Sequence, residues 1–329
     1  MNSFTPRQHI SHRFDHAIRL LALALLLAIL AACAPANAAA PQTPGASTQP
    51  GVVPSLAPSE TLTGEPTGTR TPKPSPTPDL RLKPEDWQQW SVTPQVSANA
   101  IAIYRRGLEQ GTDPTHFSKI GDCQNVPTYF LGMFDDPEKY TLGEDYAYLL
   151  PTIEHFAGSW NRTSAAVKGG YNVASVLSPL MANEDICEPG ETPLQCELRL
   201  HNPSIAIISM ETWWSKKPGD EYEKYMRQIL DQVIEHGAVP IIATKADNLE
   251  GDHRINQVIA KLAYEYDIPM WNFWAATDPL WHHGLTNDGF HLTVGHNDFD
   301  DRLAMRYGWP WRNLTGLQAI DAVWNAVQE

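Results

Sequence analysis

The chain has few basic residues for its size, and this scarcity excludes one broad class of function. Of the 329 residues, 24 are Lys or Arg and 38 are Asp or Glu, which gives a formal net charge of −14 at pH 7. Residues 85–329 hold 17 of the basic and 34 of the acidic residues, without any run of Lys and Arg. Because proteins bind polyanions through clustered positive charge, we expect no nucleic acid among the partners.

The chain also lacks an apolar run long enough to span a membrane. The run Leu20–Ala32 has 13 residues, and a helix of that length rises about 20 Å against a hydrocarbon core of about 30 Å. Arg7, Arg13 and Arg19 precede this run. A positively charged segment followed by a short apolar one is typical of a secretory signal, so we expect the folded part to lie outside the cytoplasm.

Cysteine is scarce, but one of the four cysteines stands at an informative position. Cys33 directly follows Leu30-Ala31-Ala32. This pattern is similar to the bacterial lipobox, in which the cysteine becomes the lipid-modified first residue of the mature chain. The resemblance implies a signal peptide at residues 1–32 and a lipid anchor on Cys33 in the cell membrane. The alternative is cleavage at an Ala-x-Ala site such as Ala36-Asn37-Ala38, which would make the protein secreted.

The composition changes again after the signal. In residues 33–84, 12 of 52 residues are Pro, and Thr, Ser and Gly supply another 16. Such a segment has too little apolar surface to offset its chain entropy, and its prolines favour an extended spacer. We therefore expect a disordered tether at 33–84 and a single folded domain at 85–329.

Segments typical of strands and of helices alternate in the folded part. The apolar segments 204–209, 239–244 and 269–274 predict strands. Apolar residues at helical spacing predict helices at 221–235, 254–266 and 314–327. Alternating strands and helices with short connections predict a three-layer α/β/α sandwich with a central parallel sheet. Functional groups are then expected where the strands end.

Two segments carry side chains suited to nucleophilic catalysis. In the first, Gly121-Asp122-Cys123 follows an apolar approach, which predicts a strand that ends in a turn exposing the thiol. In the second, Asp288-Gly289-Phe290-His291, the carboxylate and the imidazole are three residues apart in a glycine-containing loop. The carboxylate can orient the imidazole, and the imidazole can activate a weak nucleophile.

Over about residues 115–329 the chain resembles the SGNH hydrolases, also called GDSL-type lipases and esterases. The family's opening motif is Gly-Asp-Ser with serine as the nucleophile, and Cys123 stands at the serine position here. The closing motif Asp-x-x-His is matched by Asp288 and His291. The resemblance implies a flavodoxin-like α/β/α fold, with Cys123 as nucleophile, His291 as base and Asp288 as the partner of His291.

The resemblance also implies an oxyanion hole, and the sequence departs from the family there. A family glycine that donates its backbone N–H is matched by Gly169 or Gly170, and we take Gly170, with Asp122 in the same pocket. The family's Gly-x-Asn-Asp block would follow the 204–209 strand. Here Glu211 and Trp213 occupy that region, and Trp213 aligns with the asparagine that donates to the oxyanion. Loss of one such donor costs about 10²- to 10³-fold in turnover. We expect Glu211 to border the pocket.

The remaining cysteines are close enough in sequence to pair. Cys187 and Cys196 enclose eight residues rich in turn formers, so we expect a disulfide between them. Cys123 then stands alone, either as a nucleophile or as a buried, inert thiol. The nearby His282-His283 pair fits no recognised zinc spacing, and we expect neither a metal nor another cofactor.

Together these features predict an extracytoplasmic hydrolase that transfers the acyl group of an ester. The expected substrates include O-acylated carbohydrates. Thioesters are included as well, because a thiol nucleophile forms a thioester intermediate. The alternative is a catalytically inactive surface binding protein of the same fold, since two of the family's chemical positions differ in this chain.

Overall fold

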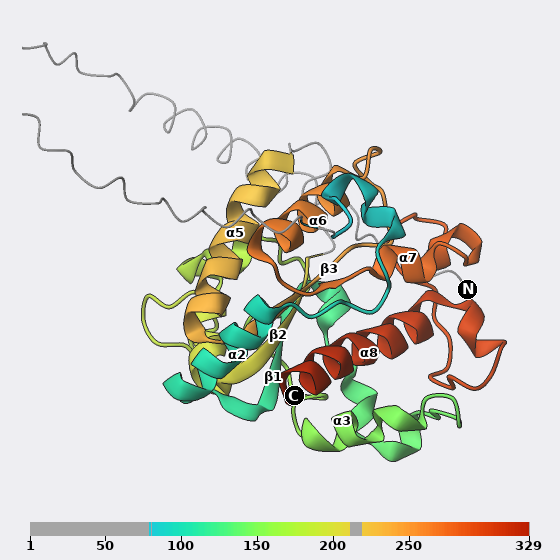
Figure 1. Ribbon diagram of the computed structural model, residues 1–329, viewed down its shortest axis with the longest axis horizontal. Helices are drawn as coiled ribbons and strands as arrows, with labels where there is room; N and C mark the ends of the chain where they lie inside the picture. Colours follow the sequence, from blue (N-terminus) through green and yellow to red (C-terminus); the bar gives the residue numbers. More distant parts are fainter. Residues whose placement is uncertain (1–78, 80, 211–218, 329) are drawn as a thin grey trace, which may run out of the picture. The chain divides into compact units, whose positions relative to one another are not determined.

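The computed structural model describes residue 79, residues 81–210 and residues 219–328 (Figure 1). Within these residues the chain forms a parallel sheet whose strands lie side by side in chain order. The class expected from the sequence, α/β with a central parallel sheet, is confirmed. The strands are β1 (Asp113–Gly121), β2 (Pro203–Ser209), β3 (Val239–Ala243) and β4 (Met270–Trp271).

A short segment extends the sheet beyond β1. Val167 forms a parallel bridge with Gly121, the last residue of β1. The Gly121 N–H donates to the carbonyl of Ala166 (3.1 Å), and the Lys168 N–H donates to the carbonyl of Gly121 (3.4 Å). The segment around Val167 therefore lies on the side of β1 away from β2, and its following residues emerge beside the end of β1.

Helices pack on both faces of the sheet, an arrangement compatible with a three-layer sandwich (Figure 1). Neighbouring β1 residues show the two faces: Ser118 bonds to Glu197 of one helix layer, whereas Lys119 points the other way, to the carbonyl of Trp160. The helices are α2 (Ala98–Gln110), α3 (Leu150–His155), α4 (Pro193–His201), α5 (Gly219–His236), α6 (Arg254–Tyr266), α7 (Phe273–Thr277) and α8 (Gly308–Gln328).

Local sequence explains where several elements begin. Every residue of β2 is buried, as expected for a central parallel strand that is covered on both faces. Helix α4 starts with a capping box in which the Thr192 hydroxyl accepts from the Gln195 N–H and the Gln195 side chain accepts from the Thr192 N–H. These two bonds satisfy donors that a helix start otherwise leaves open.

The strand predicted at 269–274 is shorter than expected. Only Met270–Trp271 pair with β3, and α7 begins at Phe273. The side chain of Asn272 accepts from the Ala275 N–H and so caps α7, which ends the strand. Helix α8 begins at Gly308 rather than at residue 314, because Pro310 is compatible with the first turn of a helix.

The first described residues already contact the domain. The Arg81 guanidinium donates to the carbonyl of Tyr264 and to the carboxylate of Asp267, at the end of α6. The short 3₁₀ helix Pro84–Gln89 follows and also packs on α6. In the part of the chain that the structure describes, no helix combines the length and the apolar character needed to cross a bilayer.

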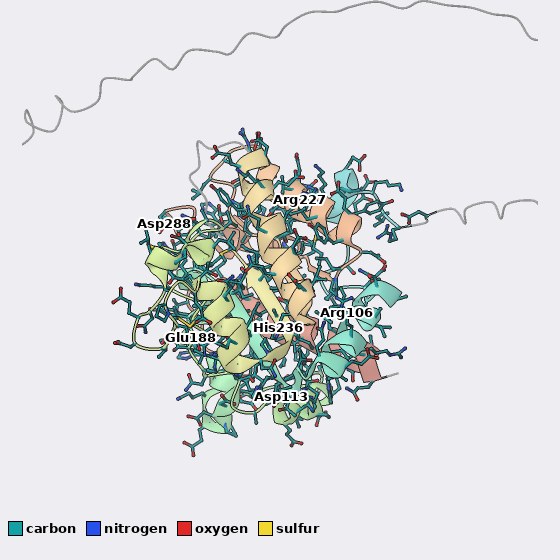
Figure 2. All side chains as sticks on the ribbon, turned by 90° about the vertical axis from the view of Figure 1, so that its left-hand side faces the viewer. Arg106, Asp113, Glu188, Arg227, His236 and Asp288 are labelled. Atoms are coloured by element: carbon teal, nitrogen blue, oxygen red, sulfur yellow. A yellow bond between two sulfur atoms is a disulfide. The ribbon has the colours of Figure 1, made fainter. Side chains whose placement is uncertain are left out.

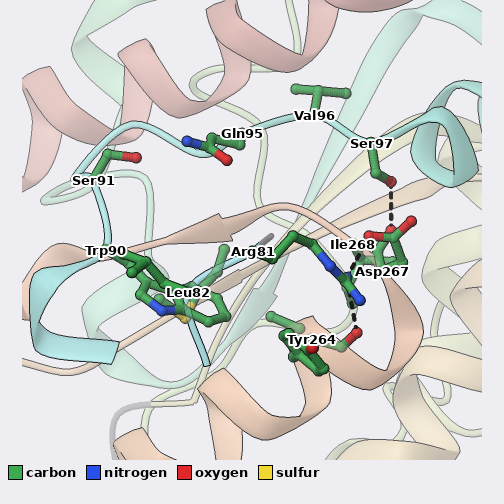
Figure 3. Close-up of a pocket in the computed structure, with 12 residues that line it drawn as sticks. Arg81, Leu82, Trp90, Ser91, Gln95, Val96, Ser97, Tyr264, Asp267 and Ile268 are labelled. Carbon is green, nitrogen blue, oxygen red and sulfur yellow. Dashed lines mark hydrogen bonds and ion pairs between the residues drawn. The ribbon is translucent and has the colours of Figure 1, made fainter. Parts of the chain in front are cut away.

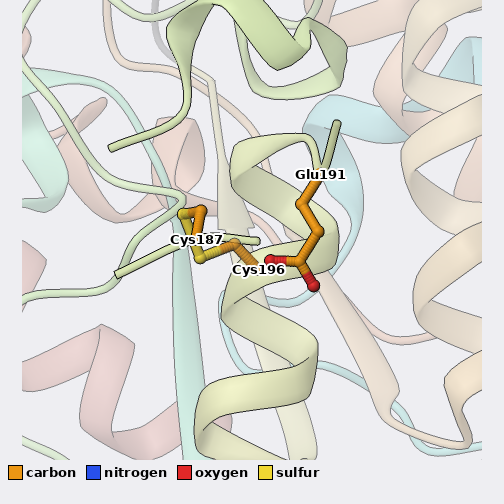
Figure 4. Close-up of side chains that lie close together, drawn as sticks. All are labelled: Cys187, Glu191 and Cys196. Atoms are coloured by element: carbon orange, nitrogen blue, oxygen red, sulfur yellow. A yellow bond between two sulfur atoms is a disulfide. The ribbon is translucent and has the colours of Figure 1, made fainter. Parts of the chain in front are cut away.

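A disulfide joins Cys187 to Cys196, in agreement with the spacing of the two residues (Figure 4). Cys196 lies in α4, so the bond fixes the preceding loop to that helix. The carboxylate of Glu191 lies beside the sulfurs and pairs with Arg199 at 2.6 Å. Because both sulfurs are bonded to each other, this group offers no thiolates to a metal.

Candidate functional site

The chain turns sharply at the end of β1, as the sequence predicts. Asp122 is buried and its side chain accepts from the Gln124 N–H at 3.0 Å, which starts the short 3₁₀ helix Cys123–Asn125. Cys123 is partly exposed and forms no disulfide. The side chain of Asp122 therefore shapes the turn that presents the thiol.

Gly121 is required by the close packing beneath this turn. A Cβ atom at Gly121 would lie 1.9 Å from the Asn125 amide nitrogen and 2.4 Å from the carbonyl oxygen of Ser209. That amide nitrogen donates to the Ser209 carbonyl at 2.7 Å. The Asn125 side chain therefore joins the turn after β1 to the last residue of β2.

The two glycines after the Val167 bridge lie beside Cys123. The Tyr171 N–H donates to the Lys168 carbonyl at 3.1 Å, which closes a turn with Gly169 and Gly170 at its centre. Gly170 has φ +85°, a conformation that favours glycine. A Cβ at Gly169 would lie 3.8 Å from the Cys123 Cβ, whereas a Cβ at Gly170 would meet nothing within 4 Å. Of the two, Gly169 faces the cysteine.

Asp288 and His291 form the contact that the sequence predicts. Asp288 Oδ2 accepts from His291 Nδ1 at 2.7 Å, while Oδ1 accepts from the Thr286 hydroxyl and from the N–H groups of Phe290 and His291. The bonds from His291 and Thr286 hold the pKa of the Asp288 carboxyl well below its usual range. Because this carboxylate only accepts, Nδ1 carries the proton and Nε2 is the nitrogen left for proton transfer.

The loop that carries this pair is attached to the start of α8. Thr293 bonds to the carbonyl of Gly284 through both its N–H and its hydroxyl, at 2.8 Å each, which closes the loop. The Thr293 hydroxyl accepts from the Gly308 N–H at 2.9 Å, and the Thr293 carbonyl accepts from the Trp309 N–H at 3.1 Å. The position of the loop is therefore set by the first turn of α8.

The next turn of α8 contacts the Cys123 turn. Arg312 Nε donates to the carbonyl of Gln124 at 3.4 Å, and Nη2 donates to the Ser209 hydroxyl at 2.8 Å. In Figure 2, Asp288 lies toward the end of the molecule opposite Asp113, where β1 begins. The thiol turn and the Asp288–His291 pair thus both belong to the edge where the strands end.

An open hollow of about 440 Å³ adjoins the loop that carries the pair. His282 and His283, which line it, have φ values of 50° and 53°, a strained conformation that is frequent at functional sites. The Trp281 ring stacks on His282 and is 72% exposed. This hollow lies along the part of the loop that precedes His291, and neither Asp288 nor His291 is among its lining residues, which are Leu280, His282, His283, Leu285, Thr286, Asn287 and Gly289.

A separate cavity of about 300 Å³ lies where the chain enters β4 (Figure 3). Arg81 crosses it, with its guanidinium 4.1 Å from the centre of the Tyr264 ring and bonded to Asp267. Because parallel strands begin at the edge opposite the one where they end, this cavity is remote from Cys123.

The end of β3 carries charged side chains that bond to one another. Lys245 Nζ lies 2.5 Å from Asp247 Oδ1 and 2.6 Å from Glu250 Oε2, and all of these side chains are nearly inaccessible to solvent. Buried charges require such partners. This cluster fixes the loop between β3 and α6, and its lysine is not available to a substrate.

Three residues predicted for the site or the anchor lie outside the described residues. These are Glu211 and Trp213, which follow β2, and Cys33 in the proposed anchor. Conversely, sequence reasoning overlooked Asn125 and Arg312. The available signal was a cationic residue inside an otherwise apolar helix start, Trp309-Pro310-Trp311-Arg312.

The chain was compared with protein-family models, curated proteins and solved structures, and none of them matches it.

Proposed function

We propose that the chain is an extracytoplasmic hydrolase of the SGNH type that cleaves esters through an acyl-thioester on Cys123. The observation that carries the proposal is the attachment of two chemically matched segments to one helix start. The Asp288–His291 loop bonds to Gly308 and Trp309, and the Cys123 turn bonds to Arg312.

The order of segments across the sheet supports this fold type. Counting the Val167 bridge, the second extended segment in the chain lies outside the first, and β2, β3 and β4 follow on the other side. This is the 2-1-3-4-5 order of flavodoxin-like folds, in which ligands bind at the carboxyl ends of the strands beside the first strand. Cys123 occupies that position.

The proposed reaction has two steps. In the first, His291 Nε2 takes the Cys123 proton, the sulfur attacks the ester carbonyl, and the leaving alcohol departs with a proton from the imidazolium. In the second, His291 takes a proton from water, the hydroxide attacks the thioester, and the acid leaves as the thiol is restored. Asp288 holds the ring and stabilises its charged form.

Backbone N–H groups would receive the negative charge of the tetrahedral intermediates. We assign this role to the N–H groups of Cys123 and of the glycine turn, at Gly169 or Gly170. The turn lies beside Cys123 because Lys168 bonds to the carbonyl of Gly121. We take O-acylated carbohydrates as the first substrate class to test, with the open hollow along residues 280–289 as the proposed place of the alcohol component. Thioesters are the other class to test.

Location outside the cytoplasm forms part of the proposal. We infer a lipid anchor on Cys33, with the proline-rich residues that follow it as the spacer to the domain, which Arg81 already contacts through α6. A secreted form, cleaved after Ala38, is the other outcome.

The enzymatic proposal is tested with the full chain on short-chain aryl esters and thioesters. Wild type is expected to turn over at least one of them, and His291→Ala is expected to lower kcat/KM by about 10²- to 10⁴-fold. Cys123→Ala removes the nucleophile and is expected to abolish turnover. Cys123→Ser tests whether a serine hydroxyl, the nucleophile of the SGNH family, supports turnover in this chain. Equal inertness of wild type and His291→Ala, together with binding of a glycan or peptide, would establish the inactive binding protein instead.

A further inference from the structure

A buried arginine lies directly beneath the Cys123 turn. Arg312 has 0% exposure. Its guanidinium carbon lies 4.6 Å from the ring centre of Phe130, 5.0 Å from that of Phe273 and 5.3 Å from that of Trp271. Burial of a cation is costly unless its surroundings compensate, and aromatic faces do so in part. The fold therefore maintains a positive charge at this point.

The polar contacts of Arg312 reach the ends of two strands. Nη2 donates to the hydroxyl of Ser209, the last residue of β2, and Nε donates to the carbonyl of Gln124, the residue after Cys123. Ser209 in turn accepts from the Asn125 side chain through its carbonyl. The Arg312 guanidinium therefore connects the turn that carries Cys123 to the end of β2.

We propose that Arg312 is a positioning residue that holds the Cys123 turn in place and favours the thiolate form of Cys123. This inference rests on the proposed function, because it assigns Cys123 the role of nucleophile. A thiolate is stabilised by a nearby positive charge, and the interaction is stronger where water is excluded. Because a guanidinium is a permanent cation in proteins, the proposed effect does not vary with pH.

Other charged groups act on the same thiol. Asp122 directly precedes Cys123 in the turn, and its negative charge opposes ionisation of the thiol. Lys168 contributes its backbone to the turn that holds Gly169 and Gly170. On the loop attached to α8, Asp288 pairs with His291, and His291, as the proposed base, also favours the thiolate. Glu211, after β2, lies outside the described residues. The effect of Arg312 on the thiol is therefore measured as the difference between wild type and an Arg312 variant, because the other charged groups are the same in both.

The experiment measures alkylation of Cys123 by iodoacetamide as a function of pH, in the full chain, with peptide mass spectrometry to separate Cys123 from the other cysteines. Alkylation follows the thiolate and requires no ester substrate. Wild type is expected to show its inflection below about 8.5, the value of an ordinary cysteine. In Arg312→Met the inflection is expected to move upward by about one pH unit, a tenfold loss of thiolate at neutral pH.

Two further variants separate charge from structure. Arg312→Lys retains the charge and is expected to keep the inflection nearer to wild type than to Arg312→Met. Arg227→Met, on α5, removes the same charge from an ion pair with Glu223 and is expected to leave the inflection unchanged.

The inference is overturned if Arg312→Met and wild type share one inflection. If Arg312→Met does not fold, a wild-type inflection at or above about 8.5 overturns it equally. A low inflection that depends on Arg312, in a protein that hydrolyses no ester, would refute the proposed hydrolase and leave the role of Arg312 intact.

Discussion

Lys119 is a buried lysine whose ammonium group bonds to backbone carbonyl oxygens. Its ammonium group donates to the carbonyls of Trp160 (2.7 Å) and Phe130 (3.3 Å), and the residue is 2% exposed. Burial, with a smaller effect from the Arg162 cation, lowers the pKa of Lys119 to about 7. In the unfolded chain the pKa of a lysine is about 10.4. Between pH 7 and about pH 10.4, Lys119 is therefore protonated in the unfolded chain but neutral in the folded protein.

The free energy of unfolding should therefore rise with pH between about 7 and 10.4, by up to about 1.4 kcal/mol per pH unit from this residue. Below about pH 7 both states are protonated and the contribution is constant. In Lys119→Met this slope should be reduced, as measured by urea unfolding at several pH values. Lys139→Met, at a mostly exposed lysine, is the control. A slope that is the same in wild type and Lys119→Met would show that Lys119 is not neutralised in the folded state.

Asp288 is expected to matter through the orientation of His291. In Asp288→Asn the amide no longer imposes a protonated Nδ1, so Nε2 is less often the basic nitrogen. Turnover of the best ester should fall by about 10²- to 10⁴-fold. Because Asp288 is half exposed, its replacement should leave the melting temperature nearly unchanged.

Asp278→Asn is the matched control for that variant. Asp278 also faces a histidine, with its Oδ1 3.6 Å from His283 Nδ1, and it is similarly exposed. Its replacement should leave turnover near wild type. Equal losses in the two variants would argue that the acidic surface as a whole, rather than the Asp288–His291 pair, supports the reaction.

At the scale of elements, the sequence predicts best what neighbouring residues determine. Helix α6 has the bounds expected from its apolar spacing, Arg254–Tyr266. The Asp288–His291 contact is likewise local, since the two residues are three positions apart. By contrast, β4 is shortened by the cap that Asn272 places on α7, and apolar periodicity alone does not reveal such a cap.

Contacts between segments that are far apart in the chain could not be predicted from the sequence, because local patterns do not show which segments meet in the fold. Arg312 and Gln124 are 188 positions apart, and the position of Arg312 becomes clear only when α8 is seen to start at Gly308. The choice of Gly170 over Gly169 also depended on a turn whose orientation is set by the bridge between Gly121 and Val167. A single sequence without this pairing gives no reason to prefer either glycine.

The junction of β1 and β2 gives a prediction at the same scale. Gly121→Ala would place a Cβ against the Asn125 amide and the Ser209 carbonyl, and overpacking of this kind costs about 1–3 kcal/mol. Urea unfolding should show that loss. Gly219→Ala is the control, because its nearest neighbour, Val258, would lie at 3.5 Å. If the two variants are equally stable, the turn after β1 is less tightly packed than described.

At the scale of the whole molecule, we propose a lipid anchor, a spacer and a folded domain in chain order. If Cys33 is lipidated, the full chain produced in a bacterium with lipoprotein processing should fractionate with membranes, and Cys33→Ala should shift it to the soluble extracytoplasmic fraction. Cys123→Ala removes a cysteine without touching the proposed anchor and should stay with the membranes. Release of wild type into the medium would instead support the secreted form.

The central claim is that Cys123 and His291 act on the same acyl group, although they are 168 positions apart in the chain. The most direct measurement is peptide mass spectrometry of the full chain after rapid mixing with an activated aryl ester. We predict an acyl group on Cys123 in wild type, and slower loss of that group in His291→Ala because water is no longer activated. Absence of acylation at Cys123, or loss of the acyl group at the same rate in wild type and His291→Ala, would contradict the account.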